Sequence, residues 1–178
     1  MEDFGGIERR AARIKLLLMD CDGVLTDGQV MLLENGDEQK TFNVRDGHGI
    51  VLLHQAGLKT GIISGRTSSA TVRRGRDLGI NLVFQNSLDK IKDFEELLAA
   101  ENIPESEVAF VGDDVTDIPL MQRVELAVAV ADAARETLDA AHYVTAARGG
   151  HGAVREVAEL ILKAQGRWAE LMAHYTKG

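Results

Sequence analysis

The sequence is poor in cysteine, proline and aromatic residues. Its 178 residues include one cysteine, two prolines and only 4% Phe, Trp and Tyr. The single cysteine, Cys21, excludes a disulfide within the chain and a zinc site built on several cysteines, and it suits a reducing compartment. With so few aromatic rings, the core must be built from Leu, Val, Ile and Ala.

Positive charge is also in deficit, and long apolar runs are absent. There are 20 Lys and Arg against 28 Asp and Glu, so the net charge is −8. This is the wrong sign for a general polyanion binder, and we expect no nucleic-acid partner. The charged N-terminus lacks a secretory apolar stretch, and no run approaches the ~20 apolar residues of a membrane span. We therefore expect a cytoplasmic protein with no membrane partner.

Short apolar runs alternate with longer segments of helical period. The length predicts one domain, residues 1–178. Runs that are apolar at every residue are typical of parallel strands covered by helices on both faces, so we predict an α/β fold with a doubly wound, Rossmann-like parallel sheet. The predicted strands are Ile14–Met19, Thr60–Ile63, Leu82–Phe84, Val108–Val111, Leu126–Val130 and His142–Val144. The predicted helices are Gly47–Gln55, Thr67–Leu78, Leu88–Ala100, Thr116–Val124, Ala133–Ala140 and Ala153–Gly166.

One segment, about 29–42, breaks this alternation. Gln29–Leu33 and Glu38–Phe42 are each long enough for a short strand, and Asn35-Gly36 between them suits the positive φ angles of a tight turn. We interpret the segment as a β-hairpin inserted after the first strand. An irregular loop is the alternative.

Five carboxylates follow two of the predicted strands. In an open α/β sheet, ligands bind beyond the carboxyl ends of the strands, which is where these residues lie. Clustered carboxylates repel one another, so the group implies a bound cation or raised pKa values. Oxygen ligands without His or Cys favour Mg²⁺. The five residues are Asp20, Asp22, Asp113, Asp114 and Asp117.

Other polar residues near predicted strand ends suit a phosphoryl group. A carboxylate beside a divalent cation can attack phosphorus, and a second carboxylate can carry the leaving-group proton. The Ser64 hydroxyl, the backbone N–H groups around Gly65 and the ammonium of Lys90 are donors for phosphoryl oxygens. Simpler roles remain open: Ser64 and Asp117 could cap helices, and Lys90 could be a surface lysine.

Taken in order, these residues carry a resemblance. Asp20-x-Asp22-Gly-Val, a hydrophobic strand followed by Ser64-Gly, an isolated Lys90 and Gly112-Asp113-Asp114-x-x-Asp117 resemble the four motifs of haloacid dehalogenase-like phosphatases. The stretches DGVLTDG, FNVRDGHGI, ISGR, VGDD, AVADA and GGHGAVREV are similar to the small 3-deoxy-manno-octulosonate 8-phosphate phosphatases. That similarity runs from about residue 14 to residue 166.

The resemblance implies Mg²⁺-dependent hydrolysis of a sugar-acid phosphate in lipopolysaccharide biosynthesis. Asp20 would be the nucleophile that forms an aspartyl-phosphate, and Asp22 the general acid and base. Mg²⁺ would be held by Asp20, Asp113 and the main-chain carbonyl of Asp22, with Asp114 and Asp117 in or near the surrounding layer. Phosphoryl oxygens would be bound by Ser64, Gly65 and Lys90. The residues expected near the sugar are Thr26, Arg45, Asp46, Gly47 and Arg66.

His151 departs from the pattern of this subfamily, which more often has Arg between the glycines at this point. A neutral imidazole holds a carboxylate less firmly than a guanidinium does. A nonulosonate 9-phosphate or another small phosphoester is therefore an alternative substrate, although Arg66 fits the octulosonate type better. A non-catalytic oligomerisation or regulatory module is a further alternative, but it would have no need for repelling carboxylates.

Members of the superfamily usually carry a cap domain, for which this chain leaves no room. The resembling subfamily forms tetramers in which hairpins pack together and a neighbour covers the site. The apolar run Val30–Leu33 is compatible with such a buried face. We therefore expect a homotetramer whose hairpin and C-terminal helix and tail, about 153–178, complete adjacent active sites.

Overall fold

A computed structural model describes residues 4–34 and 36–176 of the chain. Its main feature is a six-stranded sheet in the order β5-β4-β1-β6-β7-β8, in which each strand is parallel to its neighbours. The doubly wound parallel sheet is thereby confirmed. Its strands are β1 (Leu16–Met19), β4 (Lys59–Ile63), β5 (Leu82–Phe84), β6 (Val108–Gly112), β7 (Leu126–Ala129) and β8 (Tyr143–Val144).

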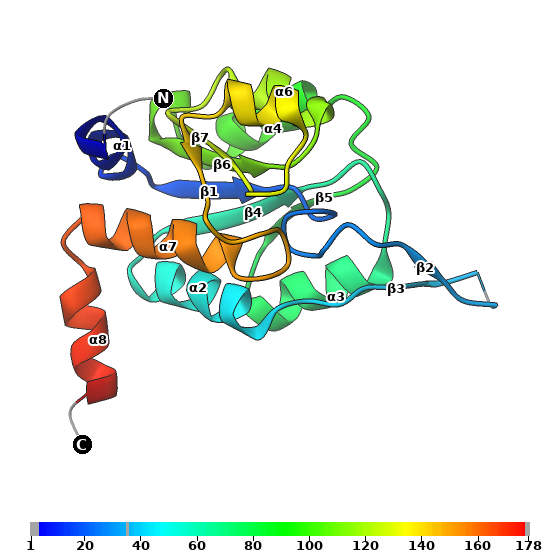
Figure 1. The fold of residues 1–178 in the computed structure, drawn as a ribbon, viewed down its shortest axis with the longest axis horizontal. Helices are drawn as coiled ribbons and strands as arrows, with labels where there is room; N and C mark the ends of the chain where they lie inside the picture. The colour runs from blue at the N-terminus through cyan, green and yellow to red at the C-terminus, as the bar shows by residue number, and fades with distance from the viewer. Residues whose placement is uncertain (1–3, 35, 177–178) are drawn as a thin grey trace.

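Helices cover both faces of the sheet (Figure 1). One face is covered by α2 (Val44–Gln55), α3 (Ser69–Leu78) and α7 (Ala153–Ala164). The other carries α4 (Lys90–Glu101), α5 (Ile118–Met121) and α6 (Arg135–Ala140). From β1 the chain builds outward through β4 and β5, then returns to place β6 on the other side of β1. The order of strands therefore reverses between β1 and β6, which is where ligands bind in folds of this type.

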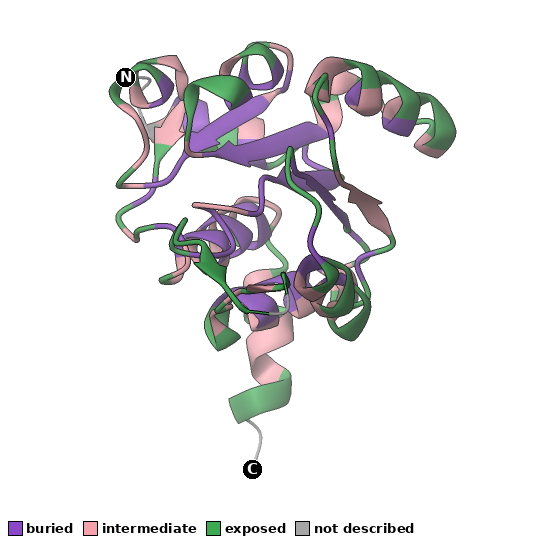
Figure 2. Cartoon of the chain, turned by 90° about the vertical axis from the view of Figure 1, so that its right-hand side faces the viewer, coloured by how far each residue is buried: buried purple, intermediate pink, exposed green. Residues whose placement is uncertain are grey.

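The core consists of two apolar layers separated by the sheet. Because side chains alternate along a strand, Leu17 and Met19 of β1 join the layer under α2 and α7, whereas Leu16 and Leu18 join the layer that contains Phe94. All four β1 side chains are fully buried, as the colouring of the central strands in Figure 2 shows. Burial on both faces explains why the strands are apolar at every residue.

The inserted hairpin is present but pairs over a shorter length than predicted. Strands β2 (Met31–Leu32) and β3 (Glu38–Gln39) form an antiparallel ribbon that projects from the body (Figure 1), while Asn35 of the predicted turn lies outside the described residues. Gly36 has the positive φ, +86°, expected of the turn. Between β1 and β4 the described chain forms only this ribbon, α2 and loops, so no cap domain is found there.

Three elements differ from the prediction. Helix α1 (Phe4–Ala11) was not predicted, because glycine at positions 5 and 6 disfavours a helix; Ile7 and Ala11 stabilise it by packing into the layer under α7. The predicted tail contains a further helix, α8 (Trp168–Thr176), after a break at Gly166, where φ is +68°. The helix predicted at Thr116–Val124 is a 3₁₀ turn, Val115–Asp117, followed by the short α5. Among the described helices, none has the length and apolar character to cross a membrane.

Candidate active site

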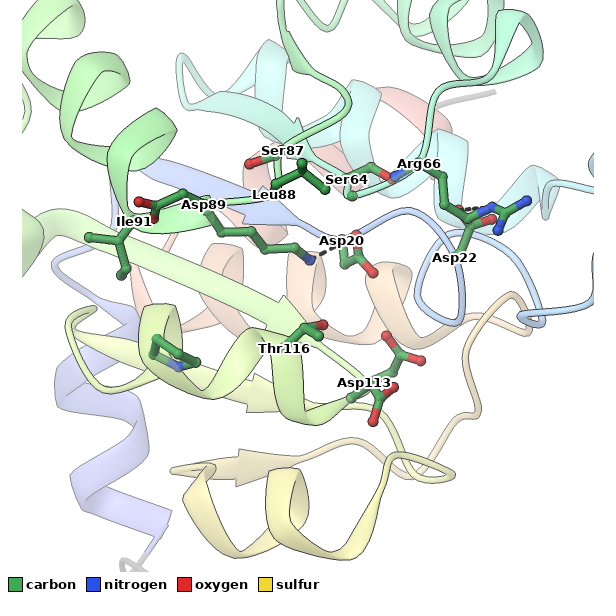
Figure 3. A pocket seen from close by; sticks show the side chains of 14 residues that line it. Asp20, Asp22, Ser64, Arg66, Ser87, Leu88, Asp89, Ile91, Asp113 and Thr116 are labelled. Atoms are coloured by element: carbon green, nitrogen blue, oxygen red, sulfur yellow. Dashed lines mark hydrogen bonds and ion pairs between the residues drawn. The ribbon is translucent and has the colours of Figure 1, made fainter.

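The predicted acids meet at the carboxyl ends of β1 and β6, where the strand order reverses. All of them except Asp117 line a cavity of about 620 Å³, which is also lined by residues following β4 and by the start of α4 (Figure 3). The cavity brings together residues predicted for catalysis, phosphate binding, metal binding and substrate binding: Asp20, Asp22, Ser64, Gly65, Arg66, Lys90, Asp113 and Asp114.

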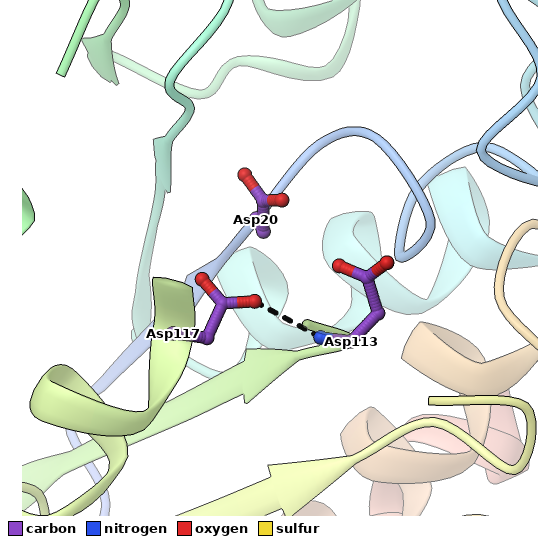
Figure 4. A group of neighbouring side chains, drawn as sticks. All are labelled: Asp20, Asp113 and Asp117. Atoms are coloured by element: carbon purple, nitrogen blue, oxygen red, sulfur yellow. Dashed lines mark hydrogen bonds between the residues drawn. The ribbon is translucent and has the colours of Figure 1, made fainter. Parts of the chain in front are cut away.

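Three carboxylates form the centre of this site. One oxygen from each of Asp20, Asp113 and Asp117 lies within 4.8 Å of the others (Figure 4). The fully buried Asp117 already uses both of its oxygens: Oδ1 accepts from Lys90 Nζ at 2.6 Å, and Oδ2 accepts from the backbone N–H of Asp113 at 3.0 Å. Asp117 also forms a capping box with Asp114 at the 3₁₀ turn. It therefore combines the capping role left open above with support for the cluster.

Gly23 allows the loop after β1 to approach Asp113. Its φ is +91°, and a Cβ at this position would lie 2.0 Å from Asp113 Oδ2. A residue with a side chain would be strained here and would displace the carboxylate. A glycine is thus required at position 23, because the loop after β1 lies so close to Asp113 at the end of β6.

The protein alone does not balance the charge of this cluster. Burial raises the pKa of Asp113 to about 8, and the neighbouring carboxylates of Asp20 and Asp117 act in the same direction. Burial likewise raises the pKa of Asp20 to about 6, although Lys90 opposes the shift. Carboxylates whose ionised forms are this disfavoured suit a site that takes a divalent cation, and an all-oxygen set of donors fits Mg²⁺.

Ser64 and Lys90 also line this cavity. The buried Ser64 accepts a hydrogen bond from the backbone N–H of Arg66 at 3.3 Å; it does not cap α3, whose N-cap is Ser68. Lys90 Nζ lies 3.2 Å from Asp20 Oδ1, and its side chain is 9% exposed. Burial would lower the pKa of Lys90, but Asp20 and Asp117 outweigh this effect and raise it. Lys90 is therefore a charged group of the site and not a surface lysine.

Two charged residues of the hairpin, Glu38 and Lys40, lie at the site although the sequence did not predict them there. Lys40 Nζ donates to Asp22 Oδ1, and Glu38 accepts from the guanidinium of Arg66, whose Nε lies 3.9 Å from Asp22 Oδ2. Figure 3 shows Arg66 reaching toward Asp22 at the edge of the cavity. We call Asp22, Glu38, Lys40 and Arg66 the hairpin charge cluster. The available signal was their spacing, because Glu38 and Lys40 are two residues apart on the predicted strand Glu38–Phe42 and would share a face there.

Two of the predicted sugar-binding residues, Asp46 and Thr26, hold backbone groups of neighbouring segments. Asp46 is 1% exposed, and its carboxylate accepts the backbone N–H groups of Gly152 at 3.1 Å and Arg155 at 2.8 Å. It thus caps the start of α7. Thr26 is also buried, and its Oγ1 accepts from the backbone N–H of Gly23 at 3.3 Å. Neither side chain lines the cavity.

Gly47 and Arg45 also lie outside the cavity lining. Gly47 is buried, and a Cβ there would lie 2.3 Å from an Nη atom of Arg74, so its role is to admit that side chain. Arg45 is exposed at the start of α2. Of the residues predicted near the sugar, Arg66 is the one that lines the cavity in this chain.

His151 turns toward its own loop. Its Nδ1 lies 2.8 Å from the carbonyl oxygen of Gly149. The preceding glycines pack against the loop after β1: a Cβ at Gly149 would lie 1.7 Å from the carbonyl oxygen of Gly23. The Gly149–His151 segment therefore packs against the loop after β1, and His151 is not part of the cavity lining.

Comparison with known proteins agrees with this geometry. The haloacid dehalogenase-like hydrolase family matches residues 77–157 of the chain. A 3-deoxy-D-manno-octulosonate 8-phosphate phosphatase from Yersinia pestis is 47% identical over 157 residues, which cover 88% of this chain and 84% of that protein. This chain belongs to the same family of phosphatases.

Solved structures place the chain in this phosphatase family with the same fold. A probable YrbI family phosphatase from Pseudomonas syringae has a TM-score of 0.96 at 44% identity, covering 98% of this chain and 99% of that one. The octulosonate phosphatase from Moraxella catarrhalis, solved with magnesium, phosphate and KDO, has a TM-score of 0.95 at 38% identity, covering 97% and 99%. The predicted fold class and enzyme class are both confirmed.

Proposed function

We propose that this protein hydrolyses 3-deoxy-D-manno-octulosonate 8-phosphate to the free sugar acid and inorganic phosphate. The observation that carries the proposal is the meeting of Asp20, Asp113 and Lys90 in one cavity at the strand-order reversal. The substrate follows the relatives from Yersinia and Moraxella, and Arg66 at the cavity edge is a cation suited to the sugar carboxylate.

The first chemical step would form an aspartyl-phosphate. A carboxylate oxygen of Asp20 bonds to phosphorus as the bond from phosphorus to the sugar oxygen breaks. The bonding electrons leave with the sugar oxygen, which takes a proton from the carboxyl group of Asp22. Ser64, the N–H groups around Gly65 and Lys90 bind the other phosphoryl oxygens.

The second step would return the enzyme to its starting state. Asp22, now ionised, accepts a proton from a water molecule as the water oxygen bonds to phosphorus. The bond between phosphorus and the Asp20 oxygen breaks, which restores the carboxylate and releases phosphate. Each turnover therefore consumes one ester and one water, and Asp22 ends with the proton that it had at the start.

Mg²⁺ would be held by the carboxylates of Asp20 and Asp113 with the main-chain carbonyl of Asp22. When bound, it neutralises the negative charge of the cluster and of the phosphoryl group. Asp117 and Asp114 orient the loop that carries Asp113. The Asp117 carboxylate accepts hydrogen bonds from the backbone N–H groups of Asp113 and Asp114.

A substrate panel with matched variants tests this function. We expect the wild type to hydrolyse the octulosonate 8-phosphate with a higher kcat/KM than nonulosonate 9-phosphates or other phosphoesters, and we expect EDTA to abolish turnover. Asp20→Asn should reduce kcat by about 10⁴-fold or more while leaving the fold intact, because the amide is not a nucleophile. Phosphate release by Asp20→Asn at the wild-type rate would exclude the mechanism. A higher kcat/KM for a nonulosonate phosphate would exclude the substrate.

We also propose a homotetramer, in the cytoplasm, in which the hairpin and the C-terminal segment of one subunit complete the site of another. Supporting this, Val30, Met31, Leu32 and Leu33 are all exposed apolar side chains on the ribbon that projects from the body. Contiguous exposed apolar groups are typical of contact surfaces. Light scattering should give a mass of four chains; a fully active monomer would contradict the proposal.

A further inference from the structure

Lys40 is buried on a segment that otherwise faces solvent. The adjacent Gln39 and Thr41 are exposed, whereas the side chain of Lys40 is only 3% exposed. Removing an ammonium group from water is costly unless a carboxylate compensates for the lost hydration. The position of Lys40 therefore depends on its partners.

The partners of Lys40 belong to the hairpin charge cluster. Its Nζ donates to Asp22 Oδ1 and lies 4.0 Å from Glu38 Oε2. Glu38 in turn holds Arg66, so two cations and two anions lie side by side. The hairpin thus contributes one residue of each sign and joins them to the loop after β1.

This arrangement distinguishes the two oxygens of Asp22. The ammonium of Lys40 donates a hydrogen bond to Asp22 Oδ1. Asp22 Oδ2 is buried and accepts no hydrogen bond from the described residues. The carboxylate lines the cavity, with Arg66 Nε 3.9 Å from Oδ2. An oxygen without a hydrogen bond at the cavity edge is available to exchange a proton with a substrate oxygen, whereas Oδ1 is not.

We propose that Lys40 is a positioning residue for Asp22. Its ammonium holds Oδ1 and thereby presents Oδ2 to the oxygen of the leaving group. This inference rests on the proposed function, in which the sugar oxygen takes a proton from Asp22 as its bond to phosphorus breaks. Lys40 neither gives nor accepts that proton.

Lys40→Met tests the proposal with two leaving groups under single-turnover conditions, with enzyme in excess. An alkyl phosphate needs a proton on its leaving oxygen, whereas p-nitrophenolate leaves as a stable anion. We expect the rate of sugar release from the octulosonate 8-phosphate to fall by about 10- to 100-fold, because a misplaced general acid loses most of its contribution. Release of p-nitrophenolate from p-nitrophenyl phosphate should stay within about threefold of the wild-type rate.

Two further variants separate positioning from folding. Lys92→Met removes an exposed lysine of α4 that pairs with Glu96, and it should leave both rates unchanged. Lys40→Ala opens a space for a small cation, so ethylammonium chloride should restore sugar release whereas sodium chloride should not. This rescue keeps the test valid if Lys40→Met folds poorly.

Equal losses with the two leaving groups would overturn the proposal, since they indicate a structural role. No loss with either would overturn it as well, as would Lys40→Ala without rescue. Failure of the proposed function is recognised separately in the wild type: it would turn over other alkyl phosphates of the panel faster than the octulosonate 8-phosphate. The fastest of those alkyl phosphates would then replace the sugar phosphate in the comparison.

Discussion

The two sides of the cavity balance their charge in different ways. On the side formed by β1, β6 and the start of α4, four carboxylates face one ammonium group: Asp20, Asp113, Asp114 and Asp117 against Lys90. On the hairpin side, two carboxylates face two cations: Asp22 and Glu38 against Lys40 and Arg66.

This difference shows which part of the site needs a cofactor. The excess of carboxylates raises the pKa of Asp113 to about 8 through burial and like charge, so that side is complete only with a cation. The hairpin charge cluster has as many cationic side chains as carboxylates, so it has no such excess. In the proposed function, the carboxylates that hold Mg²⁺ lie on the first side, and the side chain of Asp22, which carries the proton, lies on the hairpin side.

We call the side formed by β1, β6 and the start of α4 the metal side. Asp113→Asn, which removes one of its carboxylates, should have the largest effect on kcat/KM of the variants compared below. Losing a carboxylate ligand should lower kcat/KM by about 10³-fold at fixed Mg²⁺. In the wild type, Mg²⁺ at about 100 times its Kd should add about 2.7 kcal/mol to the free energy of unfolding. For a chain of this size that corresponds to a rise in Tm of about 5–10 °C. We expect thermal unfolding of Asp113→Asn to show little of this rise.

Glu38→Gln is the matched change on the hairpin side. It also removes one carboxylate, but from the set in which cationic side chains and carboxylates are equal in number. The rise in Tm with Mg²⁺ should therefore equal that of the wild type, even where activity falls. If Glu38→Gln abolished the rise, the two sides would not be independent.

Gly23→Ala should displace the Asp113 carboxylate without removing it. The added Cβ would lie 2.0 Å from Asp113 Oδ2, so the carboxylate must move. We expect kcat/KM to fall by about 100-fold, the effect of a displacement near 1 Å in a catalytic group. The positive φ, +91°, should also cost about 1–2 kcal/mol of stability.

Gly28→Ala separates these two effects. Its φ is +77°, but a Cβ there would lie 3.5 Å from the nearest atom, the Cα of Gly23. It should lose a similar amount of stability, measured by chemical denaturation, while its kcat/KM stays within about threefold of the wild type. Equal activity losses in the two variants would show that backbone strain, and not displacement of Asp113, is the cause.

The metal side could be predicted from sequence because its signals are local. Strands buried on both faces are continuous apolar runs, and Asp20 and Asp113 directly follow two of them. Parallel pairing of β1 with β6 then brings the two strand ends together. Here the contacts between distant residues follow from the order of the strands alone.

The hairpin side could not be predicted, because its contacts depend on how an insertion folds back. Alternation places Glu38 and Lys40 on one face but does not say that this face meets Asp22. Helix α1 escaped prediction for a related reason: its stability comes from packing on α7, 150 residues further along the chain, and not from local propensity.

Asp46→Asn has the smallest expected effect and tests where the hairpin side ends. Asp46 belongs to the stretch assigned to the sugar, but its carboxylate accepts two backbone N–H groups at the start of α7. An amide can oppose only one of these donors with its oxygen, so stability should fall by about 1–2 kcal/mol and Tm by about 2–8 °C. The KM for the sugar phosphate should stay within about twofold, since no substrate contact is lost.

Asp139→Asn, at an exposed pair with Arg135, is the control and should change neither quantity. A raised KM with an unchanged Tm would instead indicate that Asp46 contacts the substrate, and the hairpin side of the cavity would then extend to α2.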